Sequence, residues 1–452
     1  MKHHIVAERR FSHSRLSEEY VELLHASGLR IYVFPKKMST VSALYATAFG
    51  AMDTAFLLEG DTAETSVPDG CAHFLEHKMF EEADGSDAYE RFSPLGADAN
   101  AYTSWDKTAY LFHATGDSEE ALRELLGFVS RPYFTKASVK KEQGIIAEEI
   151  RMNDDSPAER CFMNLLRAMY RENSIRKDIC GSEASISEIT PEVLYTCHRV
   201  FYRPSNMVLV IAGDVDPDRI AAVVDEMLPS TSDAREIFRR NDNENEPAAV
   251  NTPYVEERMT VGRPIFVIGL KDHRATTLSP DERMRRDAAM TLLKEIYFSS
   301  SSKLYSALLD EGLISPSFAA GYGATERYAF LEIAGEGDDP GRVLFEVKKT
   351  VKRAIEEGID RDAFVRAKRV MYAKAVKSFD STRTVAEMLL DYVMSDYELF
   401  RYVDLYEEIT EEEVEGLLSE IFKEECYALS VIRPTDERLT DAGALEIKED
   451  NA

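Results

Sequence analysis

The amino-acid sequence predicts an α+β protein built from two similar halves, each a sheet covered by helices. Two apolar runs typical of strands, residues 30–34 and 41–46, precede a long stretch with helical periodicity from about residue 118 to 171. Strands followed by helices within one half favour this class over a doubly wound parallel sheet. The length of 452 residues also exceeds the size at which one hydrophobic core keeps growing, so we expect more than one domain.

A long-range repeat supports the two halves. Thr190 precedes a helical pattern that leads into the apolar run 208–211, and Thr410 precedes a second one that leads into 429–432. A threonine in that position is suited to cap the first turn of a helix. The two threonines are 220 residues apart (410 minus 190), which indicates a duplicated α/β unit. The predicted boundaries are an N-terminal domain at 1–228, a polar, turn-rich linker at 229–261 and a C-terminal domain at 262–452.

Composition excludes several classes of function. With 54 basic and 82 acidic residues, the net charge of −28 opposes binding to nucleic acid or to an anionic membrane. No apolar run reaches the roughly 18 to 20 residues of a membrane span, and the first residues lack the apolar segment of a secretory signal. The five cysteines are scattered and form no Cys-x-x-Cys pair, which is typical of reduced thiols. We therefore expect a cytoplasmic protein.

The most informative motif is His73-Phe74-Leu75-Glu76-His77. Positions i, i+3 and i+4 are neighbours on a helix, so His73 and His77 could hold a zinc ion while Glu76 stays free to move a proton. The spacing fits the H-x-x-E-H signature of the inverzincins and indicates peptide-bond hydrolysis. Two histidines can also fall four residues apart by chance, so the motif needs a third ligand. Cys71 is a poor candidate because it would leave the helical face that the histidines share.

Acidic residues in a second helical stretch, 138–153, are the candidates for that ligand. Glu142 and Glu149 share one stripe of this stretch with two isoleucines, at offsets typical of a buried face. Carboxylates that face a core need a compensating cation, and zinc would supply it. Glu148 is the alternative; it lies about 100° away around the helix, on the polar side.

Together these motifs resemble the N-terminal catalytic domain of the pitrilysin, insulinase and mitochondrial processing peptidase family. Besides 73–77, the resemblance includes Asn100-Ala101-Tyr102-Thr103-Ser104 and the pair Glu142 and Glu149, and it extends over nearly the whole chain. It implies two homologous domains, each a mainly antiparallel sheet covered by helices, that form half of a clamshell. The C-terminal domain would be non-catalytic.

The resemblance also implies the roles of individual residues. His73, His77 and Glu149 would bind one zinc ion per chain, Glu76 would be the general base, and Glu142 would be a supporting acid near the metal. The segment Asn100, Ala101 and Tyr102 would be an exposed edge strand to which an extended substrate adds by main-chain pairing. Judged by periodicity alone, that segment is an ordinary strand with an Asn-led turn.

One part of the family pattern is missing. The family segment Leu-Arg-Glu-x-x-Gly-Leu-x-Tyr, which contacts the substrate and the transition-state oxyanion, matches residues 308–315 with one position missing before Gly312; Leu309 replaces the arginine and Ser315 the tyrosine. The resemblance therefore implies that this chain is the metal-bearing subunit of a heterodimer whose homologous partner supplies the arginine and tyrosine. A homodimer in which Tyr322 or Arg327 substitutes stays open.

The same fold also serves as a non-catalytic scaffold or assembly subunit in larger complexes. Those versions generally lose their metal ligands, whereas every expected ligand is present here, so the sequence favours an enzyme. An enclosed chamber would select short or unfolded peptides by size, and the sequence identifies no side-chain pockets.

Overall fold

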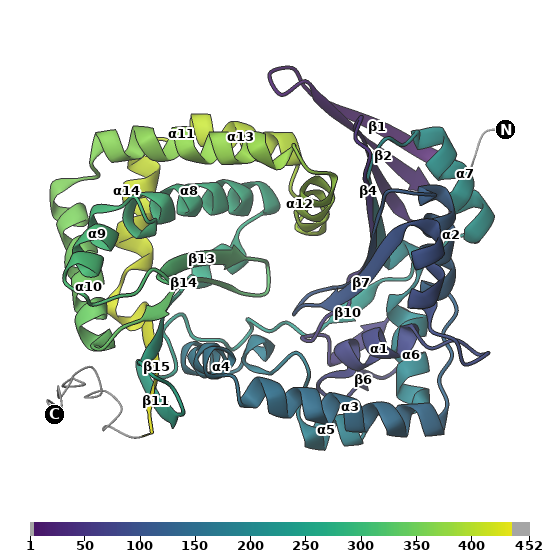
Figure 1. Ribbon diagram of the computed structural model, residues 1–452, viewed down its shortest axis with the longest axis horizontal. Coiled ribbons are helices and arrows are strands. Elements are labelled where there is room, and N and C mark those ends of the chain that lie inside the picture. The colour runs from purple at the N-terminus through teal and green to yellow at the C-terminus, as the bar shows by residue number, and fades with distance from the viewer. Residues whose placement is uncertain (1–3, 436–452) are drawn as a thin grey trace, which may run out of the picture. The chain divides into compact units, whose positions relative to one another are not determined.

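The computed structural model describes residues 4–435, which form two compact units (Figure 1). Of the described residues, unit 1 comprises 4–150, Lys177–Asn241 and Tyr372–Asp404, and unit 2 comprises Arg151–Arg176, Asp242–Met371 and 405–435. Each unit therefore draws on three separate stretches of sequence. The predicted domains, 1–228 and 262–452, divide the chain into two consecutive halves. These boundaries stay a prediction.

The main sheet of unit 1 has seven strands. In order across the sheet they are β1 Ile5–His13, β2 Glu18–His25, β3 Arg30–Pro35, β9 Met207–Gly213, β4 Val41–Thr47, β8 Thr108–Ala114 and β7 Ala97–Thr103. Only β3 and β9 pair in parallel; the other neighbours are antiparallel. A smaller sheet has the order β10 Ile237–Arg239, β5 Ala55–Leu58 and β6 Thr65–Ser66.

Both faces of the seven-stranded sheet are covered, and its central strands β9 and β4 are therefore buried along their whole length. Side chains alternate between the faces of a strand, so Leu209 and Ile211 belong to one hydrophobic cluster and Val208 and Val210 to another. The second cluster is completed by the apolar stripe of α12, Thr382–Met394. Figure 1 shows α12 on one side of this sheet and α2 and α7 on the other. The helices on that other side are α1 Cys71–Met79, α2 Ser118–Val129, α6 Pro191–Phe201 and α7 Pro217–Met227.

Unit 2 contains a five-stranded sheet. Its order is β11 Tyr254–Met259, β15 Tyr427–Pro434, β12 Ile265–Lys271, β14 Ala329–Glu336 and β13 Ala319–Ala324. The helix α4, Pro157–Met169, packs across β12 and β15. Gly269 permits this approach, because a Cβ atom there would lie 2.5 Å from the sulfur of Met169. The other helices of unit 2 are α8 Pro280–Phe298, α9 Lys303–Asp310, α10 Pro340–Glu357 and α14 Glu411–Ile421.

The remaining helices are the short α5, Glu183–Ser187, and three that contain residues of both units. These are α3 Lys136–Asp154, α11 Arg361–Ser378 and α13 Leu399–Glu408. The helical stretch predicted from about 118 to 171 corresponds to α2, α3 and α4 and is confirmed.

The predicted duplication is visible in both sheets. The strands β9 and β15 each lie between a parallel neighbour, β3 or β11, and an antiparallel one, β4 or β12. The helix before each strand begins at the predicted threonine: Thr190 accepts a hydrogen bond from the backbone of Val193, and Thr410 accepts one from that of Glu413. The prediction of two α+β halves rich in antiparallel pairing is confirmed.

The polar segment between the halves is structured in the residues that the structure describes. It contributes β10 to the small sheet and β11 to the sheet of unit 2. Two of its acidic residues are buried and form ion pairs: Asp242 pairs with Arg327, and Glu246 pairs with Lys271. Both members of the second pair are almost fully buried, with side chains 0% and 1% exposed. The polar composition of residues 229–261 therefore reflects buried ion pairs as well as solvent-exposed turns.

Breaking this buried pair should destabilise the protein. Lys271→Met leaves the Glu246 carboxylate buried without its cation, although three backbone N–H groups still donate to it. We expect a loss of about 3–5 kcal/mol in the free energy of unfolding, measured by urea denaturation. The matched control Lys303→Met removes a lysine that is 83% exposed, and it should cost about 1 kcal/mol or less. Equal losses in the two variants would contradict the argument.

Two expectations from composition can be compared with the structure. No helix within residues 4–435 combines the length and apolar character needed to cross a bilayer. All five cysteines are buried, and none of them forms a disulfide in the structure.

Candidate active site

The helix α1 carries the predicted motif and begins at a constrained position. Its N-cap residue, Gly70, has φ 86°, in the left-handed region that favours glycine. A Cβ atom at Gly70 would lie 2.3 Å from the carbonyl oxygen of Cys180, so the start of the helix lies close against that loop. From there α1 places His73, Glu76 and His77 on one face, with the two imidazole rings 4.6 Å apart. His73 and Glu76 are buried.

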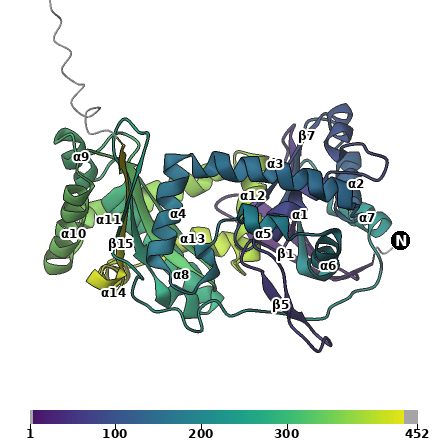
Figure 2. The same ribbon diagram turned by 90° about the horizontal axis from the view of Figure 1, so that it is seen from below.

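The third predicted ligand comes from α3, which lies beside α1 in both views (Figures 1 and 2). Glu149 presents one carboxylate oxygen to each histidine, at 3.6 Å from Nε2 of His73 and 3.6 Å from Nε2 of His77. The three ligand atoms all lie within 4.8 Å of one another. The structure therefore brings Glu149 to a histidine pair that ends 72 positions earlier along the chain (149 minus 77), and all three residues belong to unit 1.

The spacing of these atoms fits a zinc ion. Bonds of about 2.0–2.1 Å in a tetrahedral site put neighbouring ligand atoms about 3.3–3.4 Å apart. The observed 3.6 Å is close to that value and too long for a hydrogen bond. The donor set of two imidazoles and one carboxylate is also a common set in catalytic zinc sites.

Glu142 lies behind His77 and orients it. Its Oε1 is 3.1 Å from Nδ1 of His77, which leaves Nε2 of that ring facing Glu149. Burial opposes ionisation of Glu142, but the hydrogen bond and charge of His77 outweigh it and lower the pKa of the carboxyl group. An outer carboxylate of this kind fixes the tautomer of a metal-binding histidine. The geometry thus places Glu142 against the candidate ligand His77, and Glu142 is not part of the group of three that could hold a metal.

His73 has the character of a neutral ligand. Burial, together with neighbouring His77, lowers the pKa of His73 to about 3, so its ring is uncharged at neutral pH. Metal binding requires this neutral form. Nδ1 of His73 is buried and has no hydrogen-bond partner among the described residues.

Glu76 is held by a residue whose role the sequence did not reveal. The hydroxyl of Thr103, the last residue of β7, donates a hydrogen bond of 2.6 Å to Oε2 of Glu76. Burial raises the pKa of Glu76, and this hydrogen bond opposes the rise. Only the alternation of side chains along a strand could have indicated this contact, because it puts Thr103 on the same face of β7 as Ala101.

The predicted substrate-binding residues lie on a sheet edge. Among the described residues β7 pairs with β8 alone, with Asn100 opposite Leu111 and Ala101 opposite Tyr110. Tyr102 packs against the cluster under α12. The outer edge of β7 is therefore the side on which another strand could add, next to the helix that carries Glu76.

The two rival ligands lie elsewhere. Glu148 is exposed and is not part of the group that could hold a metal. Cys71 has its sulfur 3.4 Å from that of Cys197, inside the core. The stripe used in the prediction is only partly buried, because Ile145 is 47% exposed whereas Ile146 is fully buried.

The positions that depart from the family pattern belong to unit 2. Leu309 is partly exposed near the end of α9, and the hydroxyl of Ser315 is 2.6 Å from that of Ser317. The two suggested substitutes are engaged within unit 2. Tyr322 donates a 2.7 Å hydrogen bond to Asp272, and Arg327 pairs with the buried Asp242.

Comparison with known proteins gives the family. Residues 58–183 match the model described as insulinase (peptidase family M16), and residues 188–371 match that of the peptidase M16 inactive domain. The uncharacterized zinc protease YmfH of Bacillus subtilis is 37% identical over 412 residues, which cover 90% of this chain and 95% of that protein.

Solved structures agree with this. A putative M16-like peptidase from Alicyclobacillus acidocaldarius is 33% identical, with a TM-score of 0.88 over 92% of this chain and 99% of that one. A protease from Helicobacter pylori, at 17% identity, shares the fold with a TM-score of 0.78 over 95% of this chain and 100% of that one. The chain belongs to the insulinase family of M16 peptidases.

Proposed function

We propose that this chain is a zinc-dependent metallopeptidase that hydrolyses peptide bonds in short or unfolded peptides. The observation that carries the proposal is the convergence of His73, His77 and Glu149 beside Glu76. Relatives named zinc proteases support it. The match to an inactive domain covers residues 188–371, and none of the four site residues lies in that range. We also propose a cytoplasmic location, on the basis of the sequence.

The residues divide the chemistry among them. A zinc ion held by the three ligands would supply Lewis acidity, which activates water and polarises a peptide carbonyl. Glu76 accepts the proton of the attacking water and passes it to the departing amine. Glu142 keeps Nε2 of His77 available, and Thr103 fixes the Glu76 carboxylate. The edge of β7 pairs with the substrate backbone, which recognises extended peptides of many sequences.

Metal analysis with peptide digestion tests the proposal. The purified chain should retain zinc, a chelator should abolish hydrolysis of an unfolded peptide, and added zinc should restore it. A chain that never retains zinc at this site would instead be a non-catalytic scaffold subunit with the same fold.

Thr103 gives a prediction specific to this structure. Thr103→Val keeps the shape of the side chain but removes the 2.6 Å hydrogen bond to Glu76. Hydrogen bonds to charged groups contribute about 1.5–3 kcal/mol, so we expect kcat to fall by about 10-fold to 100-fold. Zinc content and KM should stay the same, and Thr103→Ser should recover most of the rate. Unchanged kcat in Thr103→Val would show that Glu76 does not depend on this contact.

We further propose that the active form is a dimer with a homologous partner. Leu309 and Ser315 cannot stabilise developing negative charge as the family's arginine and tyrosine would, and Tyr322 and Arg327 are occupied by their own carboxylate partners. A partner that retains the family arginine and tyrosine but lacks the zinc motif would complete the site.

Activity measured with and without such a partner tests the dimer. Since one missing oxyanion donor typically costs on the order of 100-fold to 1,000-fold in rate, the chain alone should be slower by at least that factor. Full activity of the purified chain at concentrations where it is monomeric would defeat the proposal. Activity that rises with its own concentration would indicate a homodimer.

A further inference from the structure

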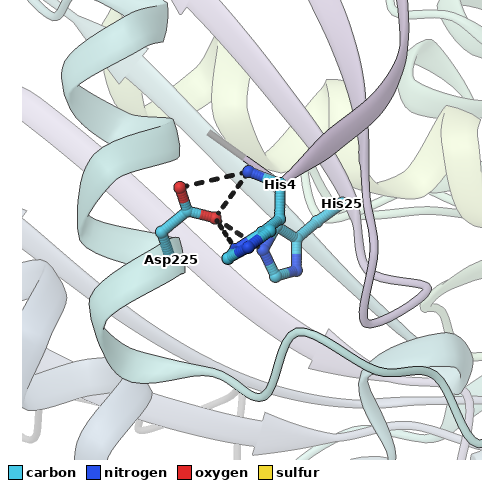
Figure 3. Close-up of side chains that lie close together, drawn as sticks. All are labelled: His4, His25 and Asp225. Atoms are coloured by element: carbon cyan, nitrogen blue, oxygen red, sulfur yellow. Dashed lines mark hydrogen bonds and ion pairs between the residues drawn. The ribbon is translucent and has the colours of Figure 1, made fainter. Parts of the chain in front are cut away.

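Unit 1 contains a second group of side chains that could bind a metal ion. The group lies where β1 begins and β2 ends, far from the turn that joins these two strands. It consists of His4, directly before β1, His25, the last residue of β2, and Asp225 on α7. Figure 3 shows the two imidazoles and the carboxylate converging. The three ligand atoms lie within 4.8 Å of one another, and none of these residues takes part in the candidate active site.

The carboxylate is at the centre of the group. Oδ1 of Asp225 is 2.9 Å from Nε2 of His25 and 3.3 Å from Nδ1 of His4. The backbone N–H of His4 also donates to this carboxylate, at 3.0 Å to Oδ1 and 3.2 Å to Oδ2. Three parts of the chain thus meet at one charged side chain.

These separations suit coordination by a transition metal. With bonds of about 2.0–2.2 Å, ligand atoms at angles between roughly 90° and 110° are about 2.9–3.5 Å apart. The two imidazole nitrogens already have this distance from Oδ1. A cation that replaces the proton between Asp225 and His25 would lie beside the line joining the two atoms, so the Asp225 carboxylate would turn to meet it.

His25 has the second contact that metal-binding histidines usually have. Its ring is buried, Nδ1 lies 2.7 Å from the hydroxyl of Ser27, and Nδ1 accepts a hydrogen bond of 3.2 Å from the backbone N–H of Ser27. When Nε2 binds a metal, the ring proton moves to Nδ1 and is donated to the Ser27 hydroxyl, in place of the hydrogen bond that Nδ1 accepts from the Ser27 N–H. Such an outer partner fixes the ring and its tautomer. The ring of His4, which is 61% exposed, leaves a path for the ion from solvent.

We propose that His4, His25 and Asp225 form a second metal site, which binds Zn²⁺ or a similar transition-metal ion. Two imidazoles and one carboxylate favour Zn²⁺, Ni²⁺ or Cu²⁺, whereas Mg²⁺ and Ca²⁺ prefer oxygen ligands. Bound metal would fasten the start of β1 and the end of β2 to α7, since each of these places supplies one ligand. The site is structural in character and independent of the proposed peptidase chemistry.

A zinc titration of the full chain tests this site. The protein should carry no oligohistidine tag, because a tag binds the same ions. Competition with a chromophoric chelator should reveal two classes of zinc site. The tight class is the candidate active site, and the weaker, second class is the site of His4, His25 and Asp225. His4→Gln and Asp225→Asn should each weaken the second class at least about tenfold and leave the tight class unchanged. The control Glu226→Gln removes the adjacent carboxylate of α7, which pairs with Arg123, and should change neither class.

The outcomes separate this site from the proposed active site. In a Glu149→Gln background the second class should persist while the tight class disappears. The proposal is overturned if the wild-type chain takes up no second equivalent of zinc, or if His4→Gln binds it as tightly as wild type. Because the His4 ring is mostly exposed, its substitution tests the site even if Asp225→Asn fails to fold.

Discussion

Replacing Glu76 with glutamine is expected to abolish peptide hydrolysis while zinc remains bound. The glutamine side chain would occupy the same volume and could still accept the hydrogen bond from Thr103, but it cannot take a proton from water. General base catalysis contributes about 100-fold to 10,000-fold in rate, so kcat of the variant should fall by at least about 100-fold. The measurements are hydrolysis of an unfolded peptide and zinc content of the same sample.

The matched control is Glu148→Gln, which removes an exposed carboxylate that is not part of the metal-binding group. It should retain both activity and zinc. An active, zinc-loaded Glu76→Gln protein would remove Glu76 from the mechanism and leave the metal assignment intact.

Substituting Glu149 is expected to release the metal and, with it, all metal-dependent activity. Glu149 is the one anionic member of the proposed ligand set, and its two oxygens face the two histidines. Loss of an outer partner usually weakens metal binding by about 10-fold to 100-fold, and loss of a direct ligand should exceed this range. We therefore expect Glu149→Gln to bind zinc at the active site more than about 100-fold more weakly, by competition with a chelator.

Glu142→Gln gives a graded comparison, because Glu142 contacts His77 from behind. Its effect on zinc affinity should be smaller than that of Glu149→Gln. If the order were reversed, Glu142 would be the ligand and Glu149 the supporting residue.

Much of the site could be predicted because its signals are local. The H-x-x-E-H spacing and the pair Glu142 and Glu149 each depend on the geometry of one helix, and the structure contains both helices as α1 and α3. The resemblance to a family supplied what local geometry could not, namely that the two helices meet. Thr103 was overlooked because its hydrogen bond joins a strand to a helix 27 residues away in sequence.

Features that depend on packing between distant segments were beyond the sequence. The charges of Asp242 and Glu246 suggested a solvent-exposed linker, since nothing local indicates that Arg327 and Lys271 would bury them. The apolar stripe of α12 could equally have covered the sheet of unit 2. An apolar stripe shows that a helix packs against something, but it does not identify the sheet.

The position of α12 has a consequence for biosynthesis. Its first residue, Thr382, is made 169 residues after the end of β9 at Gly213 (382 minus 213), yet it belongs to the same compact unit. N-terminal domains commonly fold while the ribosome is still translating. Here the N-terminal part of unit 1 emerges with one hydrophobic face of its sheet uncovered, and that face stays uncovered until α12 has been synthesised. We therefore expect unit 1 to complete its core only after residues 382–394 have left the ribosome.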